Sequence, residues 1–299
     1  MSTKPNVLFF FTDDQRFDTI AALGHDTIKT PNLDKLVARG TTFTHAHIPS
    51  GTSGAVCMPS RAMLNTGRTL YHLEGAGGSI PDDHTLIGEM FQQNGYRTFG
   101  TGKWHNGKKA YARSFTDGDE IFFGGMSDHW NVPAYHFDPD GVYDSTVRRC
   151  PTPLTSKKEE TIHCDHIEIG KHSSELFADA TINFIDNVGD APFYAYMSFM
   201  APHDPRVMPD RFKAMYNPET IALPPNFSGG HPFPIGCTKI RDEILAEFPR
   251  DPAEVKEHIS EYYGIITHLD YELGRVMDAL EAAGKLENTI IVFAGDNGL

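Results

Sequence analysis

The stretch Asn6-Val-Leu-Phe-Phe-Phe-Thr-Asp-Asp14 sets the pattern of the whole chain, because an apolar run is followed at once by acidic residues. The same arrangement recurs in three further places: residues 96–101 lead into Gly102-Lys103-Trp104-His105, residues 193–201 into Pro202-His203-Asp204-Pro205, and residues 289–294 into Gly295-Asp296-Asn297-Gly298. Near-continuous apolar runs of this length are typical of strands buried on both faces of a parallel sheet. We therefore predict four such strands, each with polar residues at its carboxyl end.

Amphipathic segments between the apolar runs predict the helices that connect parallel strands. Thr30 and Asp251 are expected to be N-caps, because each precedes a proline that suits the first helical position. The predicted helices run from Pro31 to Gly40, over 84–94, over 174–188, and from Pro252 to about Ala283. Strand–helix alternation predicts an α/β fold with a mostly parallel central sheet flanked by helices, in which ligands bind outside the carboxyl ends of the strands.

Two segments, 116–170 and 205–249, show little periodicity. Long irregular segments in compact domains are usually functional or disordered. The aromatic residues in these segments favour ordered loops that face substrate, and peripheral packing is the alternative that the sequence leaves open.

Composition excludes several classes of protein. The 299 residues carry a formal net charge of −14, which argues against a nucleic-acid or anionic-membrane surface. The longest apolar runs are too short to span a bilayer. Four cysteines at irregular spacing indicate neither a disulfide framework nor a C-x-x-C zinc site. No secretory signal is visible, so the expected location is the cytoplasm, or the periplasm or exterior if the N-terminus has been trimmed.

Asp13-Asp14 and Asp296-Asn297 follow two of the predicted strands and are expected to lie at the same sheet edge. Adjacent carboxylates repel each other unless a cation lies between them, and oxygen ligands suit Ca²⁺ or Mg²⁺. Taken alone, Asp13-Asp14 also fits a solvated turn or a helix cap. The second acidic pair turns the prediction towards a metal site.

Cys57-Met-Pro-Ser-Arg61, followed by Gly67-Arg68, is a second motif. The simple alternative is a buried structural cysteine before a short helix. At average composition, Cys-x-Pro-Ser-Arg arises by chance in about one in a thousand chains of this length.

With these motifs in this order, the chain resembles a type I, formylglycine-dependent sulfatase of the alkaline phosphatase superfamily, and carbohydrate sulfatases in particular. The resemblance covers essentially all 299 residues. It implies that a separate formylglycine-generating maturase, a transient partner, oxidises Cys57 to Cα-formylglycine. It further implies hydrolysis of a sulfuric ester through a formylglycine hydrate nucleophile and a covalent sulfo-enzyme intermediate. The expected substrate is a sulfated small molecule or glycan, and the aromatic segment Met126-Ser-Asp-His-Trp130 favours a sugar.

The resemblance also assigns a role to each site residue. One Ca²⁺ ion, preferred over Mg²⁺, would be held by Asp13, Asp14, Cys57 in its modified form, Asp296 and Asn297. A sulfate ester is an anion, so positive charge must offset the repulsion of the nucleophile. Arg61 matches the arginine that orients the hydrate, and Lys103 matches a lysine that contacts the sulfate. His203 matches the acid that protonates the leaving alkoxide, and His105 matches the base that regenerates the aldehyde.

The match to the family pattern stops at Leu299, directly after Asp-Asn-Gly. We expect residues 1–299 to form the N-terminal catalytic domain of a sulfatase, with a further sulfate-binding lysine and the C-terminal subdomain of the family absent. Poor solubility or impaired activity is expected for residues 1–299 alone. Two alternatives stay open, a phosphonate or phosphate monoester hydrolase of the same superfamily and an inactive, truncated pseudoenzyme.

Overall fold

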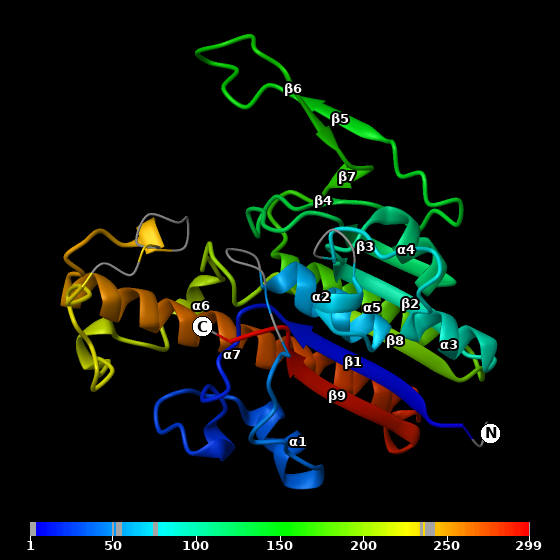
Figure 1. The fold of residues 1–299 in the computed structure, drawn as a ribbon, viewed down its shortest axis with the longest axis horizontal. Coiled ribbons are helices and arrows are strands. Elements are labelled where there is room, and N and C mark those ends of the chain that lie inside the picture. Colours follow the sequence, from blue (N-terminus) through cyan, green and yellow to red (C-terminus); the bar gives the residue numbers. More distant parts are fainter. Residues whose placement is uncertain are drawn as a thin grey trace.

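A five-stranded parallel sheet forms the centre of the protein in a computed structural model that describes residues 4–49, 51, 56–73, 77–233, 236 and 243–298 (Figure 1). The order is β3-β2-β8-β1-β9, and all neighbouring strands pair in parallel. The bounds are β1 (Asn6–Thr12), β2 (Arg97–Lys103), β3 (Asp117–Phe122), β8 (Phe193–Ser198) and β9 (Thr289–Gly295). The four predicted strands and the α/β fold class are confirmed.

The inner strands are buried on both faces, which explains their continuous apolar sequence. In β1, Leu8 and Phe10 point into one hydrophobic core, and Phe9 and Phe11 point into another on the opposite face. Successive side chains of a strand alternate between the two faces of the sheet. β9 lies at one edge of the sheet, and its Ile290 is 52% exposed.

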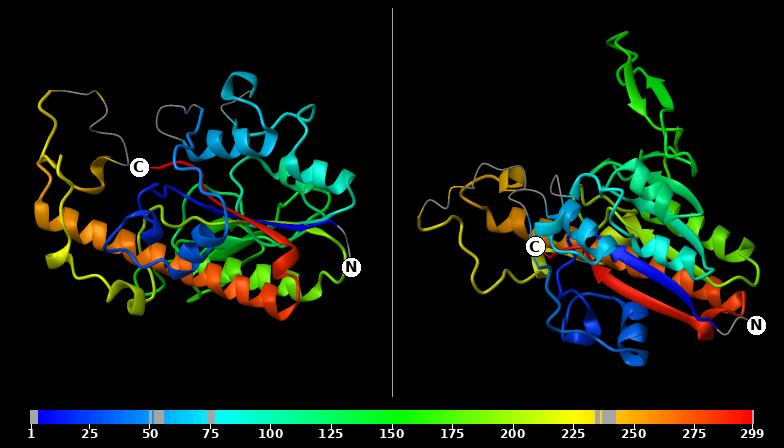
Figure 2. Two further views of the ribbon diagram at one scale, coloured as in Figure 1. Left: turned by 90° about the horizontal axis from the view of Figure 1, so that it is seen from below. Right: turned by 45° about the vertical axis from the view of Figure 1, so that its right-hand side comes forward.

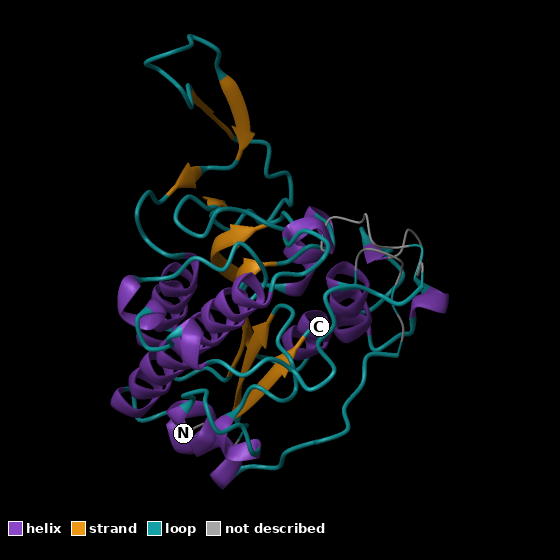
Figure 3. Ribbon diagram, turned by 90° about the vertical axis from the view of Figure 1, so that its left-hand side faces the viewer, coloured by secondary structure: helices purple, strands orange, loops and turns teal. Residues whose placement is uncertain are grey.

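Helices cover both faces of the sheet (Figures 1 and 3). One face packs against α5 (Ser173–Asn187) and the long α7 (Pro252–Ala282), on which α1 (Pro31–Arg39) also rests. The other face carries α2 (Cys57–Thr66), α3 (Ile87–Gln93) and α4 (Lys108–Ser114). A short α6 (Asp210–Lys213) packs on α7. No helix within the described ranges has the length and apolar character needed to cross a membrane.

The structure corrects three sequence predictions. Residues 116–170 contain β3, a fifth strand of the central sheet that its polar sequence Asp117-Gly-Asp-Glu conceals. β3 lies at an edge of the sheet, where charged side chains can reach solvent. The opposite edge strand, β9, nevertheless has an apolar sequence and was predicted. The helix expected over 84–94 begins only at Ile87. Thr30 does precede α1, but its side chain does not cap the helix, because Asp270 of α7 accepts hydrogen bonds from Leu33 N at 2.7 Å and Asn32 N at 3.0 Å.

The same segment also forms two small antiparallel pairs. β4 (Pro133–Ala134) pairs with β7 (His166–Ile167), and β5 (Thr146–Arg149) pairs with β6 (Glu160–His163). The β5–β6 hairpin projects away from the sheet (Figure 2).

Candidate active site

The carboxyl edge of the sheet brings the predicted site residues together, as the parallel topology requires. Asp13 and Asp14 follow β1, Lys103 ends β2 and His105 comes two residues later. The other residues come from the segments after β8 and β9 and from the first turns of α2. Asp14 has a φ of +60°, so the chain turns sharply after the strand.

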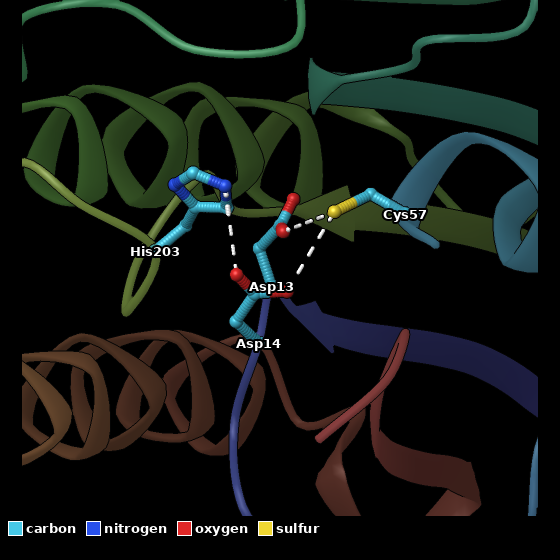
Figure 4. Close-up of side chains that lie close together, drawn as sticks. All are labelled: Asp13, Asp14, Cys57 and His203. Carbon is cyan, nitrogen blue, oxygen red and sulfur yellow. Dashed lines mark hydrogen bonds and ion pairs between the residues drawn. The ribbon is translucent and has the colours of Figure 1, made fainter. Parts of the chain in front are cut away.

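Four side chains from three elements converge in a buried cluster (Figure 4). Asp13, Asp14, Cys57 and His203 each offer a ligand atom, and these atoms all lie within 4.8 Å of one another. The Cys57 thiol donates to Asp13 Oδ1 at 3.0 Å and to Asp14 Oδ1 at 3.6 Å. Asn297 Nδ2 lies 3.7 Å from the same sulfur. Carboxylates thus surround the side chain of residue 57.

Arg61 contacts this cluster and is fully buried. Its Nη2 donates to Asp13 Oδ2 at 2.8 Å and its Nε to Asp296 Oδ2 at 3.0 Å. Nη1 donates to the backbone oxygen of Lys103 at 2.8 Å. A planar guanidinium suits this bridging role, because its donors point in fixed directions. Arg61 therefore ties together the ends of β1, β2 and β9.

Lys103 adds the second buried cation, with Nζ 2.5 Å from Asp13 Oδ2. Burial opposes ionisation of Asp13, but Lys103 and Arg61 outweigh it and lower the pKa of Asp13 to about 2. In contrast, burial and the neighbouring Asp13 raise the pKa of Asp296 to about 7, against the opposing effect of Arg61. The site is crowded with negative charge.

A hard cation fits this donor set. Asp13, Asp14 and Asp296 are all buried and exceed the two buried cations by one negative charge. A buried excess of carboxylates is costly unless a cation joins it, and the raised pKa of Asp296 expresses that cost. The amide of Asn297 is 7% exposed and offers a further oxygen if it turns over. Carboxylate and amide oxygens are ligands that Ca²⁺ and Mg²⁺ prefer.

Cys57 is poorly suited to act as a thiolate. Burial and the nearby Asp13 and Asp296 raise the pKa of its thiol well above the usual range. Because a thiol nucleophile reacts as the thiolate, unmodified Cys57 would be inert in this position. This environment suits a side chain that binds a cation as a neutral oxygen donor.

The two candidate acid–base histidines have different surroundings. Burial, together with Lys103 and Arg61, lowers the pKa of His105 to about 4, so its ring is neutral at pH 7. Its Nδ1 is buried and has no hydrogen-bond partner among the described residues. His203 directs Nε2 towards Asp14 Oδ2 at 3.5 Å, and its Nδ1 donates to the Asp204 carbonyl at 2.9 Å. The two rings thus differ in their partners: His105 Nδ1 has none among the described residues, whereas both nitrogens of His203 face oxygen atoms.

Sequence reasoning missed three polar residues that support the site. Ser198 Oγ donates to the Lys103 carbonyl at 2.7 Å. Asn106 Nδ2 donates to the carbonyls of Met58 at 2.9 Å and Gly77 at 2.7 Å. Tyr262 on α7 donates to the Asp14 carbonyl at 2.6 Å. Ser198 was detectable as the polar residue within an apolar strand, whereas no local signal marks Tyr262.

The site therefore lies at the carboxyl edge of a parallel α/β sheet, where buried carboxylates and cations meet. The model of the Sulfatase family matches residues 5–299. The chain belongs to the sulfatase family.

Curated relatives and solved structures agree with this assignment. A "Sulfatase" of Formosa agariphila is 30% identical over 99% of the chain and 59% of the relative. An "Ulvan-active sulfatase" of the same organism is 28% identical over 99% of the chain and 51% of the relative. The crystal structure of Ps i-CgsB in complex with k-i-k-neocarrahexaose has a TM-score of 0.66 and 25% identity, and covers 99% of this chain and 59% of that one. The chain thus spans between half and three fifths of the length of these relatives.

Proposed function

We propose that the chain forms the catalytic core of a sulfuric ester hydrolase that removes sulfate from a sulfated carbohydrate, with Cys57 converted to Cα-formylglycine. The observation that carries the proposal is the shared contact on Asp13, which binds Arg61 and Lys103 through Oδ2 and the side chain of residue 57 through Oδ1. The reactive residue, two fixed cations and a carboxylate therefore meet at one buried point.

Ca²⁺ is the proposed resident cation. Asp13, Asp14, Asp296, Asn297 and the modified residue 57 would hold it, and when bound it would supply positive charge beside the anionic substrate. With a divalent cation added, the buried cluster would change from an excess of one negative charge to an excess of one positive charge, which suits a sulfate ester. The aldehyde, as a hydrate, would supply an oxygen nucleophile that the inert thiol of Cys57 cannot provide.

The side chains of the cluster account for the remaining work. Lys103 is held by its contact with Asp13, so it can contact sulfate oxygens without reorganisation. Arg61 donates its N–H groups to protein acceptors, so it contributes fixed positive charge and orients residue 57 through Asp13. His203 donates through Nδ1 to a carbonyl and faces the Asp14 carboxylate with Nε2, so the ring is oriented for proton donation to a leaving alkoxide. Neutral His105, with its unpartnered Nδ1, is suited to accept a proton.

A carbohydrate substrate is supported by relatives. One of them is named for its action on ulvan, and the Ps i-CgsB structure holds k-i-k-neocarrahexaose. The aromatic segment Met126-Ser-Asp-His-Trp130, whose sequence is suited to sugar rings, begins four residues after the end of β3.

Two measurements test the proposal. Peptide mass spectrometry on protein from a maturase-containing host should find formylglycine at position 57, and an unmodified thiol there would remove the nucleophile. Turnover should be compared on an aryl sulfate, an aryl phosphate and a phosphonate monoester. We expect the sulfate to be preferred and Cys57→Ala to abolish turnover. Preference for the phosphonate would favour a phosphonate hydrolase, and a modified protein inert on all three would favour a pseudoenzyme.

A further inference from the structure

Two buried histidines outside the active site bind the loop that carries His203. The ring of His129 hydrogen-bonds to the backbone of His203. His172 Nε2 donates to the carbonyl of Val207 at 2.9 Å. The loop between β8 and α6 is therefore bound at two carbonyl groups, four residues apart, by imidazoles that come from another part of the chain.

The two rings form a rigid pair. They stack with centroids 4.9 Å apart and an interplanar angle of 9°, and their side chains are 1% and 0% exposed. His129 Nδ1 lies 2.6 Å from Ser173 Oγ, which leaves Nε2 to donate to the carbonyl of His203. His172 Nδ1 accepts from Ser174 N at 3.2 Å and so caps α5. The start of α5 thereby fixes both rings.

Both imidazoles are in the protonation state that this arrangement requires. Burial lowers the pKa of His129 to about 4 and that of His172 well below its ordinary value. A neutral ring has one donor and one acceptor nitrogen, which matches one carbonyl and one donor for each ring. Two neutral rings also stack without charge repulsion. His268 of α7 packs against His172 with centroids 4.6 Å apart and an interplanar angle of 59°.

We propose that His129 and His172 act as positioning residues, a clamp that holds His203 at the distance from the leaving group that proton donation requires. The other end of the loop is fixed to the sheet, because Asp13 N donates to the Ala201 carbonyl at 3.1 Å. Between this anchor and Val207, the loop also makes two local contacts, from His203 Nδ1 to the Asp204 carbonyl and from Val207 N to the Pro205 carbonyl, both at 2.9 Å. The two histidines join the same loop to another part of the chain. The proposal rests on the proposed function, in which His203 is the general acid.

The decisive experiment compares leaving groups. A series of phenyl sulfates with increasingly basic phenolates needs increasing help from a general acid. His129→Phe keeps the ring stack but loses the hydrogen bond, so its loss of kcat/KM should grow along the series to about tenfold to hundredfold for the poorest leaving group. His129→Gln restores a donor in place of Nε2 and should recover most of that loss. Equal losses along the series, or no recovery with Gln, would overturn the clamp.

A second measurement does not depend on turnover. Hydrogen–deuterium exchange of the peptide that spans 199–208 should be faster in His129→Phe than in the parent protein. His136→Phe is the matched control. His136 belongs to the same segment, 116–170, as His129, but it is largely exposed and pairs with Asp119 at 2.7 Å. If the exchange rate in His129→Phe is unchanged, the clamp proposal is wrong, whether or not the parent protein hydrolyses sulfate esters. Absence of sulfate hydrolysis in the parent protein would by itself refute only the proposed function.

Discussion

Substitution of Arg61 by Met tests whether the buried cation holds the site together. The guanidinium is fully buried and donates to two carboxylates, Asp13 Oδ2 at 2.8 Å and Asp296 Oδ2 at 3.0 Å, and also to the Lys103 carbonyl. Methionine fills much of the same volume but leaves both carboxylates without this partner. The substitution therefore removes charge and hydrogen bonds while it creates little cavity.

The expected loss is large for a single residue. Removal of one partner from a buried ion pair costs about 3–5 kcal/mol, because the remaining charge stays desolvated. Here two carboxylates lose a partner, so we expect a loss in the free energy of unfolding at the upper end of that range without Ca²⁺. Added Ca²⁺ should reduce the loss, because it supplies positive charge to the same oxygens.

Urea denaturation of Arg61→Met and parent protein, with a chelator and with Ca²⁺, measures this loss. Arg97→Met is the matched control, since Arg97 also pairs with a carboxylate, Asp117 at 3.0 Å, but both side chains are about two fifths exposed. Exposed pairs contribute about 0–1 kcal/mol. If the free energy of unfolding falls no further in Arg61→Met than in Arg97→Met, the buried ion network does not stabilise the fold.

Three further predictions follow from the same structure. Burial raises the pKa of Asp270 to about 6. The protonated carboxyl therefore contributes fully to the free energy of unfolding below about pH 4, and about 3 kcal/mol of that free energy is lost as the pH rises through 6. Asp270→Asn should remove this decline when denaturation is measured from pH 4 to 7. Gly102→Ala should prevent folding or cost more than about 4 kcal/mol, because at φ +78° its Cβ would lie 1.8 Å from Ser198 O. Ca²⁺ should raise the Tm of the parent protein but raise that of Asp14→Ala much less, in calorimetric scans.

Each prediction has its own contrary result. A parallel pH dependence in Asp270→Asn and the parent would show that Asp270 titrates normally. Gly95→Ala is the control for Gly102→Ala, because Gly95 also has a positive φ, +77°, but open space around its Cβ position, so about 1 kcal/mol is expected. Similar losses for both glycines would mean that the close contact is relieved elsewhere. An equal Ca²⁺ shift with Asp14→Ala would place the cation away from Asp14.

Four strands of the sheet were predictable because each coincides with an apolar run in the sequence, β9 included although it lies at an edge of the sheet. β3 was not predictable, since its sequence Asp117-Gly-Asp-Glu is polar and resembles a loop. The N-cap of α7 was predictable, because Asp251 accepts from Ala253 N and Glu254 N, its near neighbours in sequence. The cap of α1 was not, because Asp270 lies 237 positions from Leu33.

The sequence by itself determined which residue types stand at the carboxyl ends of the strands, and parallel topology then required them to meet. Only the tertiary structure decided how they meet: that Arg61 bridges Asp13 and Asp296, that Asp13 divides its oxygens between two cations and Cys57, and that His129 and His172 hold the His203 loop. The physical reason is the distance along the sequence between the interacting residues. A strand or cap is encoded by neighbours, whereas a charge network and a hydrogen-bonded clamp depend on packing between segments distant in the chain.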